Sequence, residues 1–380
     1  MPSRQRRLLT IGHSYCVALN RRLAHELARA SGEAWHVTAV APTFFRADLR
    51  AVRTQMEPGE ASSLVTVGAQ LTGHLPLFFY RPALRRVLAE GWDLVHAWEE
   101  PYVVAGGQIA WWCPRRTPIV FFTFQNITKR YPPPWSAIET MCRERCAGWL
   151  PAGETVAQVQ IGRGWDEKPY RVLPPGVDTE MFRPEPGAGR AMRAELEWEE
   201  TGAPVVGFLG RFVEEKGIHL LMSALDRISS PWRALFVGAG PLEPTVRRWA
   251  AGHGHRVRVL SDVSHDQVSR CLNAMDLLVA PSQTRPFWRE QFGRMLIEAF
   301  ACGVPVIASD SGEIPHVVGE AGMIVGERDE AGWQRALCEL LESPQTRAEL
   351  GERGLQRARH RYAWPVVARQ HVDFFEELLA

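Results

Sequence analysis

The sequence predicts an α/β protein with two Rossmann-like domains, each a doubly wound parallel sheet. Three observations predict this class. The chain has 380 residues, which is enough for two domains. Short apolar runs alternate with helix-like intervals, as in parallel sheets with helical crossovers. The alternation stops at a turn-rich segment and then begins again, so we expect two such sheets in succession.

The first half of the chain contains a series of apolar runs that we predict to be strands. The interval 20–30 between the first two runs has the apolar spacing of a helix. The predicted strands are Leu8–Gly12, Trp35–Ala41, Leu64–Ala69, Asp93–Trp98 and Pro118–Phe124.

The second half repeats this pattern after the turn-rich segments 174–176 and 184–190. Its predicted helices are Gly217–Ile228, Leu242–Ala251 and Met295–Cys302. Its predicted strands are Val205–Leu209, Ala234–Gly238, Arg256–Leu260, Leu277–Ala280, Val304–Ala308 and Gly322–Val325.

The junction near residues 173–186 divides the chain into two predicted domains, 1–172 and 173–362. The tail is amphipathic, with an apolar face formed by Val366, Val367, His371, Phe374 and Leu378. We expect residues 363–380 to form a closing helix that packs back on the first domain.

Ligands of doubly wound sheets bind outside the carboxyl ends of the strands. We therefore expect the loops that follow the predicted strands to carry function. These loops are Gly12–Cys16, Trp98–Tyr102, Gly210–Gly217, Gly238–Pro241 and Pro281–Gly293.

Composition excludes several classes of protein. Lys and Arg number 44 against 43 Asp and Glu, so the electrostatic footprint of a nucleic-acid-binding protein is missing. A hydrophobic content of 46% argues against disorder. Lysine occurs only at positions 129, 168 and 216, so a lysine within a motif stands out.

The cysteines indicate a reducing compartment. There are seven of them, an odd number, scattered through apolar segments, unlike a disulfide framework. Cys142 and Cys146 could share a helical face, but without a second Cys or His pair we interpret them as buried thiols and expect no metal site.

We expect a cytoplasmic protein with at most a peripheral contact at the inner face of a membrane. The apolar run Leu8–Ile11 is too short for a signal-peptide core, and no run approaches the roughly 20 residues of a membrane span. Arg81–Leu88 is either a basic amphipathic helix that touches anionic lipid or a solvated arginine face.

Arg211 and Lys216 lie in the loop that follows the first predicted strand of the second domain. A strand end followed by a helix start offers free amides and the positive end of a helix dipole, and the two cations add charge for phosphate oxygens. The loop is therefore a candidate diphosphate site. The alternative is a solvated loop in which both cations pair with Glu214 and Glu215.

Glu290 and Glu298 are eight positions apart, and the second falls within an apolar helix, where an unpaired charge is costly. If most of this interval is helical, it spans about 12 Å, the reach from a ribose across a diphosphate to a sugar ring. The alternative is that Glu298 pairs with an arginine in a structural network.

Several motifs in this order resemble the donor half of the retaining glycosyltransferases of family 4, which have the GT-B fold. They are Gly-Arg-Phe-(x3)-Lys-Gly at 210–217, Val-Gly-Ala-Gly-Pro at 237–241, Ala-Pro-Ser at 280–282, Glu290-(x7)-Glu298 and the run from Glu298 to Gly312. The segment 173–184 resembles the interdomain strand and turn of this family. The resemblance is strong over about residues 170–365 and extends to the first half only in layout. It implies two domains that face each other across a cleft.

This resemblance also implies roles for the residues of the second domain. Arg211 and Lys216 would bind the donor diphosphate and stabilise the leaving group without a metal. Glu298 would hold the ribose hydroxyls and Glu290 the hydroxyls of the donor sugar. The donor site it implies comprises Arg211, Lys216, Gly238, Val263, Glu290, Gln291, Phe292, Gly293, Arg294, Leu296 and Glu298, of which Arg211, Lys216 and Glu290 would be catalytic.

The acceptor half departs from the common pattern of the family. The first loop has a single glycine, Gly12, and the text at 95–102 resembles a subgroup with Glu-Glu-Pro-Tyr at this place. His96 is either a core histidine or part of the acceptor site. We assign no general base, because retaining members are thought to pass the acceptor proton to the donor phosphate. The acceptor-side candidates are Gly12, His13, Ser14, His96, Glu99 and Glu100.

We therefore expect a retaining, metal-independent glycosyltransferase. It would move a sugar from a UDP- or GDP-linked donor to the hydroxyl of a glycan, a lipid-linked acceptor or a small molecule. GDP-mannose, UDP-glucose and UDP-N-acetylglucosamine all remain open as donors. The nucleotide sugar is a co-substrate, and we expect no cofactor, no metal and no nucleic-acid partner.

Three alternative functions are disfavoured by the sequence. A nucleotide-sugar epimerase of the same architecture is disfavoured by the paired glutamates. A non-catalytic sugar-binding protein with two lobes would leave Arg211 and Lys216 unexplained. A tandem dehydrogenase is disfavoured because the glycines at 238 and 240 do not complete a dinucleotide fingerprint.

Overall fold

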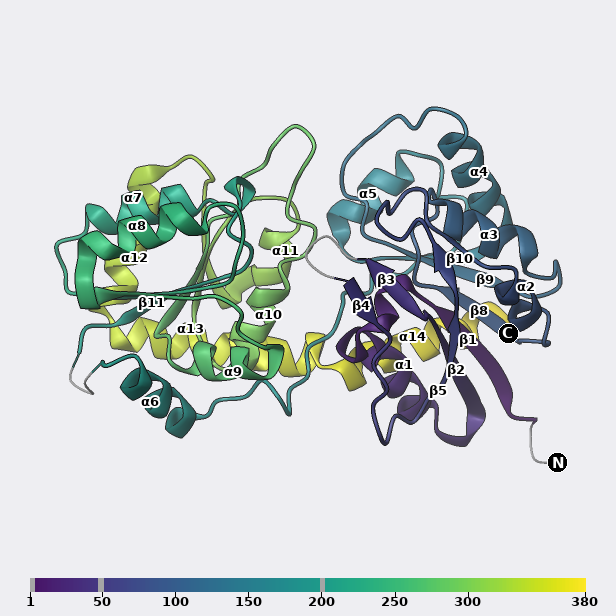
Figure 1. The fold of residues 1–380 in the computed structure, drawn as a ribbon, viewed down its shortest axis with the longest axis horizontal. Helices are drawn as coiled ribbons and strands as arrows, with labels where there is room; N and C mark the ends of the chain where they lie inside the picture. The colour runs from purple at the N-terminus through teal and green to yellow at the C-terminus, as the bar shows by residue number, and fades with distance from the viewer. Residues whose placement is uncertain (1–3, 47–50, 199–201) are drawn as a thin grey trace. The chain divides into compact units, whose positions relative to one another are not determined.

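The computed structural model describes residues 4–46, 51–198 and 202–380. Their contacts divide the chain into two compact α/β units (Figure 1). Unit 1 contains the chain up to Pro174 together with Trp364–Ala380, and unit 2 is Pro175–Ala363. In Figure 1 the yellow C-terminal helix therefore lies among the purple and blue elements of unit 1.

Unit 1 is built on a six-stranded parallel sheet with the order β10-β9-β8-β1-β2-β5. Its strands are β1 (Arg6–Ile11), β2 (Trp35–Pro42), β5 (Ser63–Val67), β8 (Leu94–Ala97), β9 (Ile119–Thr123) and β10 (Cys146–Pro151). The order reverses between β1 and β8, which makes the sheet doubly wound with its switch point at these two strands. Two short antiparallel pairs accompany it, β3 (Phe44–Arg46) with β4 (Ala51–Arg53) and β6 (Ala69–Gln70) with β7 (Phe79–Tyr80).

Alternate residues of these strands enter two different cores because helices cover both faces of the sheet. On one face Leu8, Ala39 and Phe122 pack with α1 (Ala18–Ser31) and α14 (Trp364–Leu379). On the other face Leu9, Val40 and Phe121 pack with the remaining helices of the unit. These are α2 (Ala83–Leu88), α3 (Val104–Trp112), α4 (Trp135–Arg145) and α5 (Glu154–Ile161). Burial on both faces explains why the strands read as continuous apolar runs.

One prediction for unit 1 is wrong. Cys142 and Cys146 do not share a helical face, because α4 ends at Arg145 and Cys146 begins β10. β10 was not predicted, since it follows the helix without an intervening loop and includes a glycine and a proline. Both thiols are buried and free, as are most of the other cysteines.

Unit 2 repeats the architecture of unit 1. Its six-stranded parallel sheet has the order β13-β12-β11-β14-β15-β16, with the switch point between β11 and β14. The strands are β11 (Val205–Leu209), β12 (Arg233–Val237), β13 (Val257–Leu260), β14 (Leu277–Ala280), β15 (Val306–Ser309) and β16 (Gly322–Val325). They match the predicted runs to within two residues at each end.

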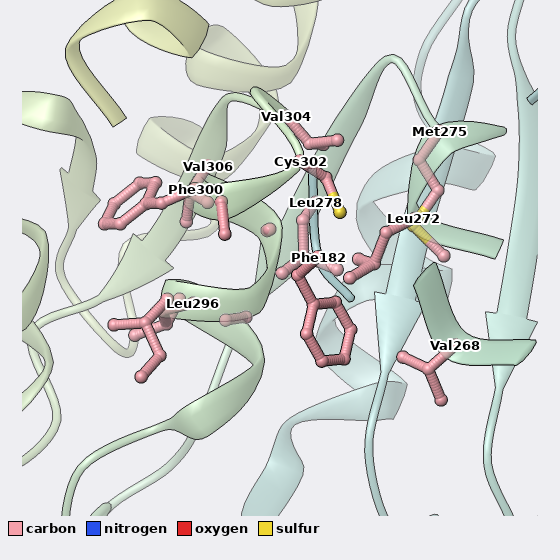
Figure 2. Packing of buried hydrophobic residues seen from close by; sticks show 14 of the residues in the cluster. Phe182, Val268, Leu272, Met275, Leu278, Leu296, Phe300, Cys302, Val304 and Val306 are labelled. Atoms are coloured by element: carbon pink, nitrogen blue, oxygen red, sulfur yellow. The ribbon is translucent and has the colours of Figure 1, made fainter. Parts of the chain in front are cut away.

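Helices also cover both faces of the second sheet. One core joins the sheet to α6 (Pro186–Glu195), α9 (His265–Asn273), α10 (Arg294–Ala301) and α11 (Ile314–Val318). Figure 2 shows this core, with Phe182 from the segment before α6 among Leu272, Leu278 and Leu296. The opposite face packs on α7 (Ile218–Asp226), α8 (Glu243–His253), α12 (Glu330–Glu342) and α13 (Pro344–Arg357). A π-helical turn (Ala358–Tyr362) follows α13.

The C-terminal segment ends the fold in unit 1. The buried face of α14 comprises Trp364, Val367, Ala368, His371, Val372, Phe374 and Phe375, and α14 packs beside α1. Of the predicted apolar face, Val366 and Leu378 are only half-buried, so the face is centred closer to Phe375 than the sequence pattern indicated.

Candidate functional site

Four of the five predicted functional loops fall at the switch points of the two sheets, and the fifth, Gly238–Pro241, follows β12. In unit 1 the loops after β1 and β8 contain His13 and Glu99, and in unit 2 the loops after β11 and β14 contain Lys216 and Ser282. A doubly wound sheet leaves its binding crevice at these loops, because the helices that follow the two strands lie on opposite faces. Each unit thus has one place where a ligand site is expected.

The loop after β11 is held tightly against the end of β14. After a 3₁₀ turn (Glu214–Lys216), Gly217 takes a φ of 67°, a left-handed conformation. A Cβ at Gly217 would overlap the carbonyl oxygen of Pro281, so only glycine allows this close approach. The backbone N–H of Gln283 also donates to the carbonyl of Glu215, at 2.7 Å. The two loops at the switch point therefore form one structure.

Lys216 and Glu290 form the centre of the site in unit 2. The Nζ of Lys216 makes an ion pair with Oε2 of Glu290, and Ser282 Oγ donates to the same oxygen at 3.0 Å. The ammonium also lies 5.3 Å from the centre of the Trp288 ring. Glu290 is buried, so its charge is placed where the lysine and the serine can stabilise it.

The alternative pairing of the loop cations is not what the structure has. Glu214 lies 3.3 Å from His219 Nε2, and Lys216 reaches Glu290 instead of its neighbours in the loop. Arg211 is exposed, and its guanidinium makes no hydrogen bond within the described parts of the chain. The cationic side chains at the end of β11 are therefore a half-buried, paired lysine and an exposed arginine.

The segment between Glu290 and α10 fixes the next group of predicted residues. The backbone carbonyl of Glu290 accepts from the N–H of Glu313 at 3.1 Å. Gly293 precedes α10 with a φ of 81°, Phe292 is buried against Tyr362, and Gln291 and Arg294 are exposed. Leu296 points into the core and not toward a ligand surface (Figure 2).

The interval from Glu290 to Glu298 is only partly helical. Because α10 begins at Arg294, the expectation of a helical span of about 12 Å is wrong for these eight positions. Only the second half of the interval has helical rise. The separation of the two carboxylates is thus set by the loop as well as by the helix.

Glu298 is a buried carboxylate on α10. Burial, the largest effect, raises its pKa above the ordinary value, and the charge of Arg294 one turn earlier lowers it by less. Within the described residues no side chain or backbone group hydrogen-bonds the Glu298 carboxylate. Such a group is costly to the fold and is stabilised by a ligand that donates hydrogen bonds.

The loops after β12 and β13 lie next to the loop after β11. Gly238 donates its N–H to the carbonyl of Leu260 at 2.9 Å, and a Cβ at Gly238 would overlap the carbonyl of Gly210. Val263 is half-buried against the core, just before Ser264 caps α9. These two predicted donor residues therefore line neighbouring strand ends of one sheet.

In unit 1 the first loop and the loop after β8 are joined through Glu99. Its carboxylate accepts from the backbone N–H of His13 at 2.6 Å, from Nδ1 of His13 at 2.6 Å and from the Tyr80 hydroxyl at 2.8 Å. Burial by itself lowers the pKa of His13, but the charge and hydrogen bond of Glu99 and the charge of Glu100 raise it overall. Gly12 packs beneath, close to Trp98 and Tyr15.

Glu100 makes its hydrogen bonds to the end of β9 and the residue that follows it. It accepts from Thr123 Oγ1 at 2.6 Å and from the backbone N–H of Phe124 at 2.7 Å. Burial, the largest effect, raises the pKa of Glu100 to about 7, against the effect of these hydrogen bonds. The two neighbouring glutamates therefore serve different loops.

His96 lies inside the core of unit 1. Its ring is fully buried among Trp98, Phe122, Phe375 and His371, and Nδ1 lies 3.1 Å from Thr10 Oγ1. Burial, followed by the nearby His371, lowers its pKa well below the ordinary value, so the ring is neutral. The structure thus separates His96 from the other acceptor-side candidates and gives it the geometry of a core histidine.

A cavity of about 200 Å³ opens beside the first loop of unit 1. Two of the predicted acceptor-side residues, His13 and Ser14, line it. The other lining residues come from the end of the first loop, from α1, from the β3 and β4 pair and from the segment before β7. They are Cys16, Val17, Asn20, Phe45, Arg46, Val52, Thr72, Gly73 and Leu75.

Sequence reasoning missed several residues that complete these sites. Trp288 against Lys216 lies in a loop that was predicted to be functional, so an aromatic residue there was the available signal. Tyr80 and Arg46 had no such signal. They reach Glu99 and the cavity from segments whose short strands are too brief to show a period.

The segment Arg81–Leu88 presents arginines outward. Leu84 and Leu88 of α2 are buried in the core of unit 1, while Arg85 and Arg86 are exposed. Outward arginines are expected both of a solvated face and of a helix that touches anionic lipid, so the choice between these two alternatives stays a prediction. Across residues 4–46, 51–198 and 202–380, no helix combines the length and the apolar character required to cross a membrane.

Two protein-family models match successive parts of the chain. The model described as "Glycosyltransferase Family 4" matches residues 20–181, and the model described as "Glycosyl transferases group 1" matches residues 203–343. The boundary between the matches lies close to the boundary between the two units.

Curated relatives include two kinds of actinobacterial enzyme. A GDP-mannose-dependent monoacylated alpha-(1-6)-phosphatidylinositol monomannoside mannosyltransferase of Corynebacterium glutamicum is 33% identical over 214 residues, which are 54% of this chain and 56% of the relative. The chain thus spans little more than half the length of that relative. A D-inositol 3-phosphate glycosyltransferase of Corynebacterium glutamicum strain R is 28% identical over 369 residues, covering 88% of this chain and 83% of the relative.

Solved structures share the fold over nearly the whole chain. A sucrose-phosphate synthase from Thermosynechococcus elongatus superposes with a TM-score of 0.74 at 21% identity, covering 98% of this chain and 99% of that one. The Anabaena protein HepE in complex with UDP gives a TM-score of 0.75 at 18% identity, covering 98% of this chain and all of the other.

Proposed function

Because the chain belongs to glycosyltransferase family 4 and has two Rossmann-like units of the GT-B type, we propose that it transfers a sugar from a nucleotide diphosphate sugar to an acceptor hydroxyl. We propose further that the transfer retains the anomeric configuration and needs no metal. The observation that carries the proposal is the arrangement of Lys216, Glu290 and Glu298 at the switch point of unit 2.

The donor diphosphate is assigned to the end of β11. Arg211 is exposed there and available to an incoming ligand, and Lys216 lies in the same loop beside Trp288. When the sugar leaves, negative charge develops on the phosphate, and the two cations would stabilise it. These cations supply the charge that a metal supplies in other transferases, which supports metal independence.

The ribose and the sugar are assigned to the two glutamates. Glu298 is buried and lacks hydrogen-bond donors among the described residues, and a pair of ribose hydroxyls would supply them. Glu290 already accepts from Lys216 and Ser282 on one oxygen, Oε2. A carboxylate accepts several hydrogen bonds, so Glu290 suits the hydroxyls of the donor sugar as well.

Retention of configuration follows from attack on the face that the leaving group vacates. The bond between the anomeric carbon and the phosphate oxygen breaks, the acceptor oxygen bonds to the same face of that carbon, and the acceptor proton passes to the departing phosphate. No side-chain base is needed for this step. The family resemblance supports this mechanism.

The names of the relatives suggest which nucleotide sugar and which acceptor to test first. One relative is named as GDP-mannose-dependent and acts on a phosphatidylinositol mannoside, and another is named for D-inositol 3-phosphate. We propose a GDP- or UDP-linked sugar as donor, with GDP-mannose as the first to test. The acceptor is proposed to be a lipid-linked or small polyol.

We also propose that the reaction takes place in the cytoplasm, with at most a peripheral contact at the membrane. The buried, free thiols support a reducing compartment. The exposed arginines of α2 are the feature that supports contact with an anionic surface.

Binding of nucleotides by the purified chain tests the donor proposal. GDP, UDP, ADP and their sugar conjugates are compared by thermal shift, because a ligand of the native state raises Tm. The proposal expects a shift with one nucleotide family that EDTA does not reduce. A shift that disappears with EDTA and returns with Mg²⁺ contradicts metal independence.

Product analysis tests the transfer itself. Incubation of the matching nucleotide sugar with an inositol or inositol phosphate acceptor should yield a glycoside with the anomeric configuration of the donor, as read by ¹H NMR coupling constants. Release of free nucleotide and an epimerised sugar without acceptor would instead identify an epimerase. Binding of the free sugar without turnover would favour a sugar-binding protein.

A further inference from the structure

The cavity beside the first loop of unit 1 combines a few polar side chains with a larger apolar lining. His13, Ser14 and Arg46 line it, together with an apolar wall that includes Val17, Phe45 and Leu75. Among its described lining residues there is no carboxylate. This composition selects a ligand with negative charge attached to an apolar or neutral body.

His13 is held in one orientation, with a hydrogen on Nδ1. Its Nδ1 lies 2.6 Å from Glu99, and an ionised carboxylate can only accept, so Nδ1 carries hydrogen. The rings of Phe45 and Phe78 lie 4.9 and 5.3 Å away and hold the imidazole from two sides. Nε2 is the nitrogen that remains for a ligand in the cavity.

The surroundings of His13 favour the protonated, cationic form of its ring. The nearby carboxylates Glu99 and Glu100 together raise the pKa of His13 despite its burial. In the protonated ring Nε2–H donates, so the ring presents positive charge to the cavity and not a lone pair. A protonated Nε2 can donate a hydrogen bond to an anion. It has no lone pair with which to accept the proton of the acceptor hydroxyl, so it cannot act as a base.

Two further groups of the cavity are donors without a protein acceptor. Arg46 is exposed, its stem lies 3.6 Å from the position of a Cβ on Gly73, and its guanidinium has no partner in the described part of the chain. The Ser14 hydroxyl is buried and also has no hydrogen-bond partner there. A buried hydroxyl without a partner is unfavourable unless a ligand completes it.

We propose that this cavity binds a phosphate ester of the acceptor, with His13, Arg46 and Ser14 as its contacts. The oxygens of one phosphate can accept from all three groups, and a guanidinium suits them in a forked geometry. The inference rests on the proposed function, because it gives the class of acceptor for that reaction. The phosphate is either part of a soluble ester or part of a lipid headgroup.

Calorimetric titration tests the site with two probes. One is sn-glycerol 3-phosphate, and the other is phosphatidylinositol in phosphatidylcholine vesicles, each compared with glycerol or with phosphatidylcholine alone. Binding of the first probe identifies a soluble phosphate ester and binding of the second a lipid headgroup, and either supports the proposal. Wild-type protein that binds neither probe, with and without saturating nucleotide, overturns it.

Substitutions locate the binding. Arg46→Gln and His13→Gln should each weaken binding of the probe that the wild type binds by about tenfold or more. This is the value of one charge-assisted hydrogen bond. Arg46→Lys should restore part of the affinity. The matched control is Arg115→Gln, which removes the same charge from an exposed position outside the cavity and should leave binding within about twofold. Equal losses in the control and in Arg46→Gln would point to non-specific attraction and overturn the assignment.

Two further measurements keep the outcomes distinct. Nucleotide binding to unit 2 should be unchanged in Arg46→Gln, so loss of phosphate binding with intact nucleotide binding places the defect in the cavity. If wild type binds nucleotide but neither phosphate probe, this inference fails and the proposed function stands. Because His13→Gln could disturb Glu99, the NMR pKa of His13 in wild type serves as an independent readout, and it should rise when glycerol phosphate binds.

Discussion

Lys216 illustrates how a single residue combines structure with function. It is one of three lysines in the chain, and its ammonium compensates the buried charge of Glu290 while lying against Trp288. In the proposed function the same ammonium would face the donor diphosphate, so it would exchange Glu290 for the phosphate when the donor binds. Its contribution therefore appears in turnover more than in stability.

Lys216→Gln should lower kcat about 10²- to 10³-fold, because one preorganised donor to developing charge is lost. Glutamine can still donate to Glu290, so Tm should fall by only a few degrees. Steady-state kinetics and a melting curve measure the two effects. Lys168→Gln is the matched control, and a comparable loss of kcat there would remove the donor-site role of Lys216.

Glu298 should show opposite effects on stability and binding. Its pKa is raised by burial, so the folded state holds the proton more tightly than the unfolded state, and stability falls as pH rises through the interval above the ordinary glutamate value. Glu298→Gln removes this cost, so it should raise Tm at neutral pH in the absence of ligand.

The same variant should lose most of its affinity for the nucleotide, about tenfold or more, because the carboxylate acceptor of the ribose hydroxyls is gone. Glu320→Gln, at an exposed position in unit 2, is the control and should change neither quantity. If Glu298→Gln lowers Tm and binds nucleotide normally, Glu298 is a structural residue.

At the scale of elements, strand ends and the turns that follow them position the site. The turn between β11 and α7 depends on Gly217, which combines a φ of 67° with direct approach to Pro281. This contact joins the two loops of the switch point. A substitution at Gly217 should therefore disturb the site even though Gly217 is not expected to contact a ligand.

Gly217→Ala should destabilise unit 2 by about 2 kcal/mol or more, because the new Cβ overlaps backbone and the left-handed conformation is strained. Nucleotide affinity should fall together with stability. Chemical denaturation and calorimetry measure both. Gly187→Ala in α6 has open space around the new Cβ and should be neutral or slightly stabilising.

The contact of α14 with the sheet of unit 1 should be sensitive to acid. Burial is the main reason that the pKa of His371 is lowered to about 4, and its packing partner His96 is likewise buried and neutral. The unfolded chain binds protons on these rings near the ordinary value of 6.5 and the folded chain does not. Stability is therefore full above that value and falls as pH decreases toward 4.

His371→Leu should flatten this pH dependence. The expected difference between wild type and variant is on the order of 3 kcal/mol between pH 6.5 and 4. Urea unfolding at a series of pH values provides the measurement. His360→Leu, at an exposed histidine of unit 2, should leave the slope unchanged, and an identical slope in His371→Leu would refute this origin of acid sensitivity.

At the scale of the whole molecule, the chain passes through unit 2 before it completes unit 1. Unit 2 is continuous from Pro175 to Ala363, whereas unit 1 needs α14 from the far end of the chain. Without α14, the apolar face formed by Leu23, Leu27 and Leu150 would be exposed to water.

The two units should therefore behave differently as fragments. Residues 175–363 should fold alone and retain nucleotide binding, while residues 1–174 should be unfolded or aggregated. Circular dichroism and melting curves test both fragments. Addition of the 364–380 peptide should restore cooperative melting to the first fragment, and a stable first fragment without it would show that α14 is dispensable.

Much of the fold could be predicted because its strands are buried on both faces. Each such strand reads as a short apolar run, which is why the runs at 205–209 and 277–280 coincide with β11 and β14. β10 was missed because no loop separates it from α4. The hairpin strands beside the cavity were missed because two or three residues show no period.

The sequence by itself determined the two doubly wound sheets and the strand ends that their loops follow, because these depend on local pattern and spacing. The residue types in those loops are the basis on which we propose a site for a diphosphate and its sugar. Only the tertiary structure decided which of those residues meet. Lys216 pairs with Glu290 across 74 positions, and His13 with Glu99 across 86. His96 lies three positions before Glu99 and turns into the core instead. Parallel sheets bring the ends of distant strands together at one edge. Neighbouring residues of a strand point to opposite faces and so enter different surroundings. Closeness in the sequence therefore does not predict which residues meet in the site.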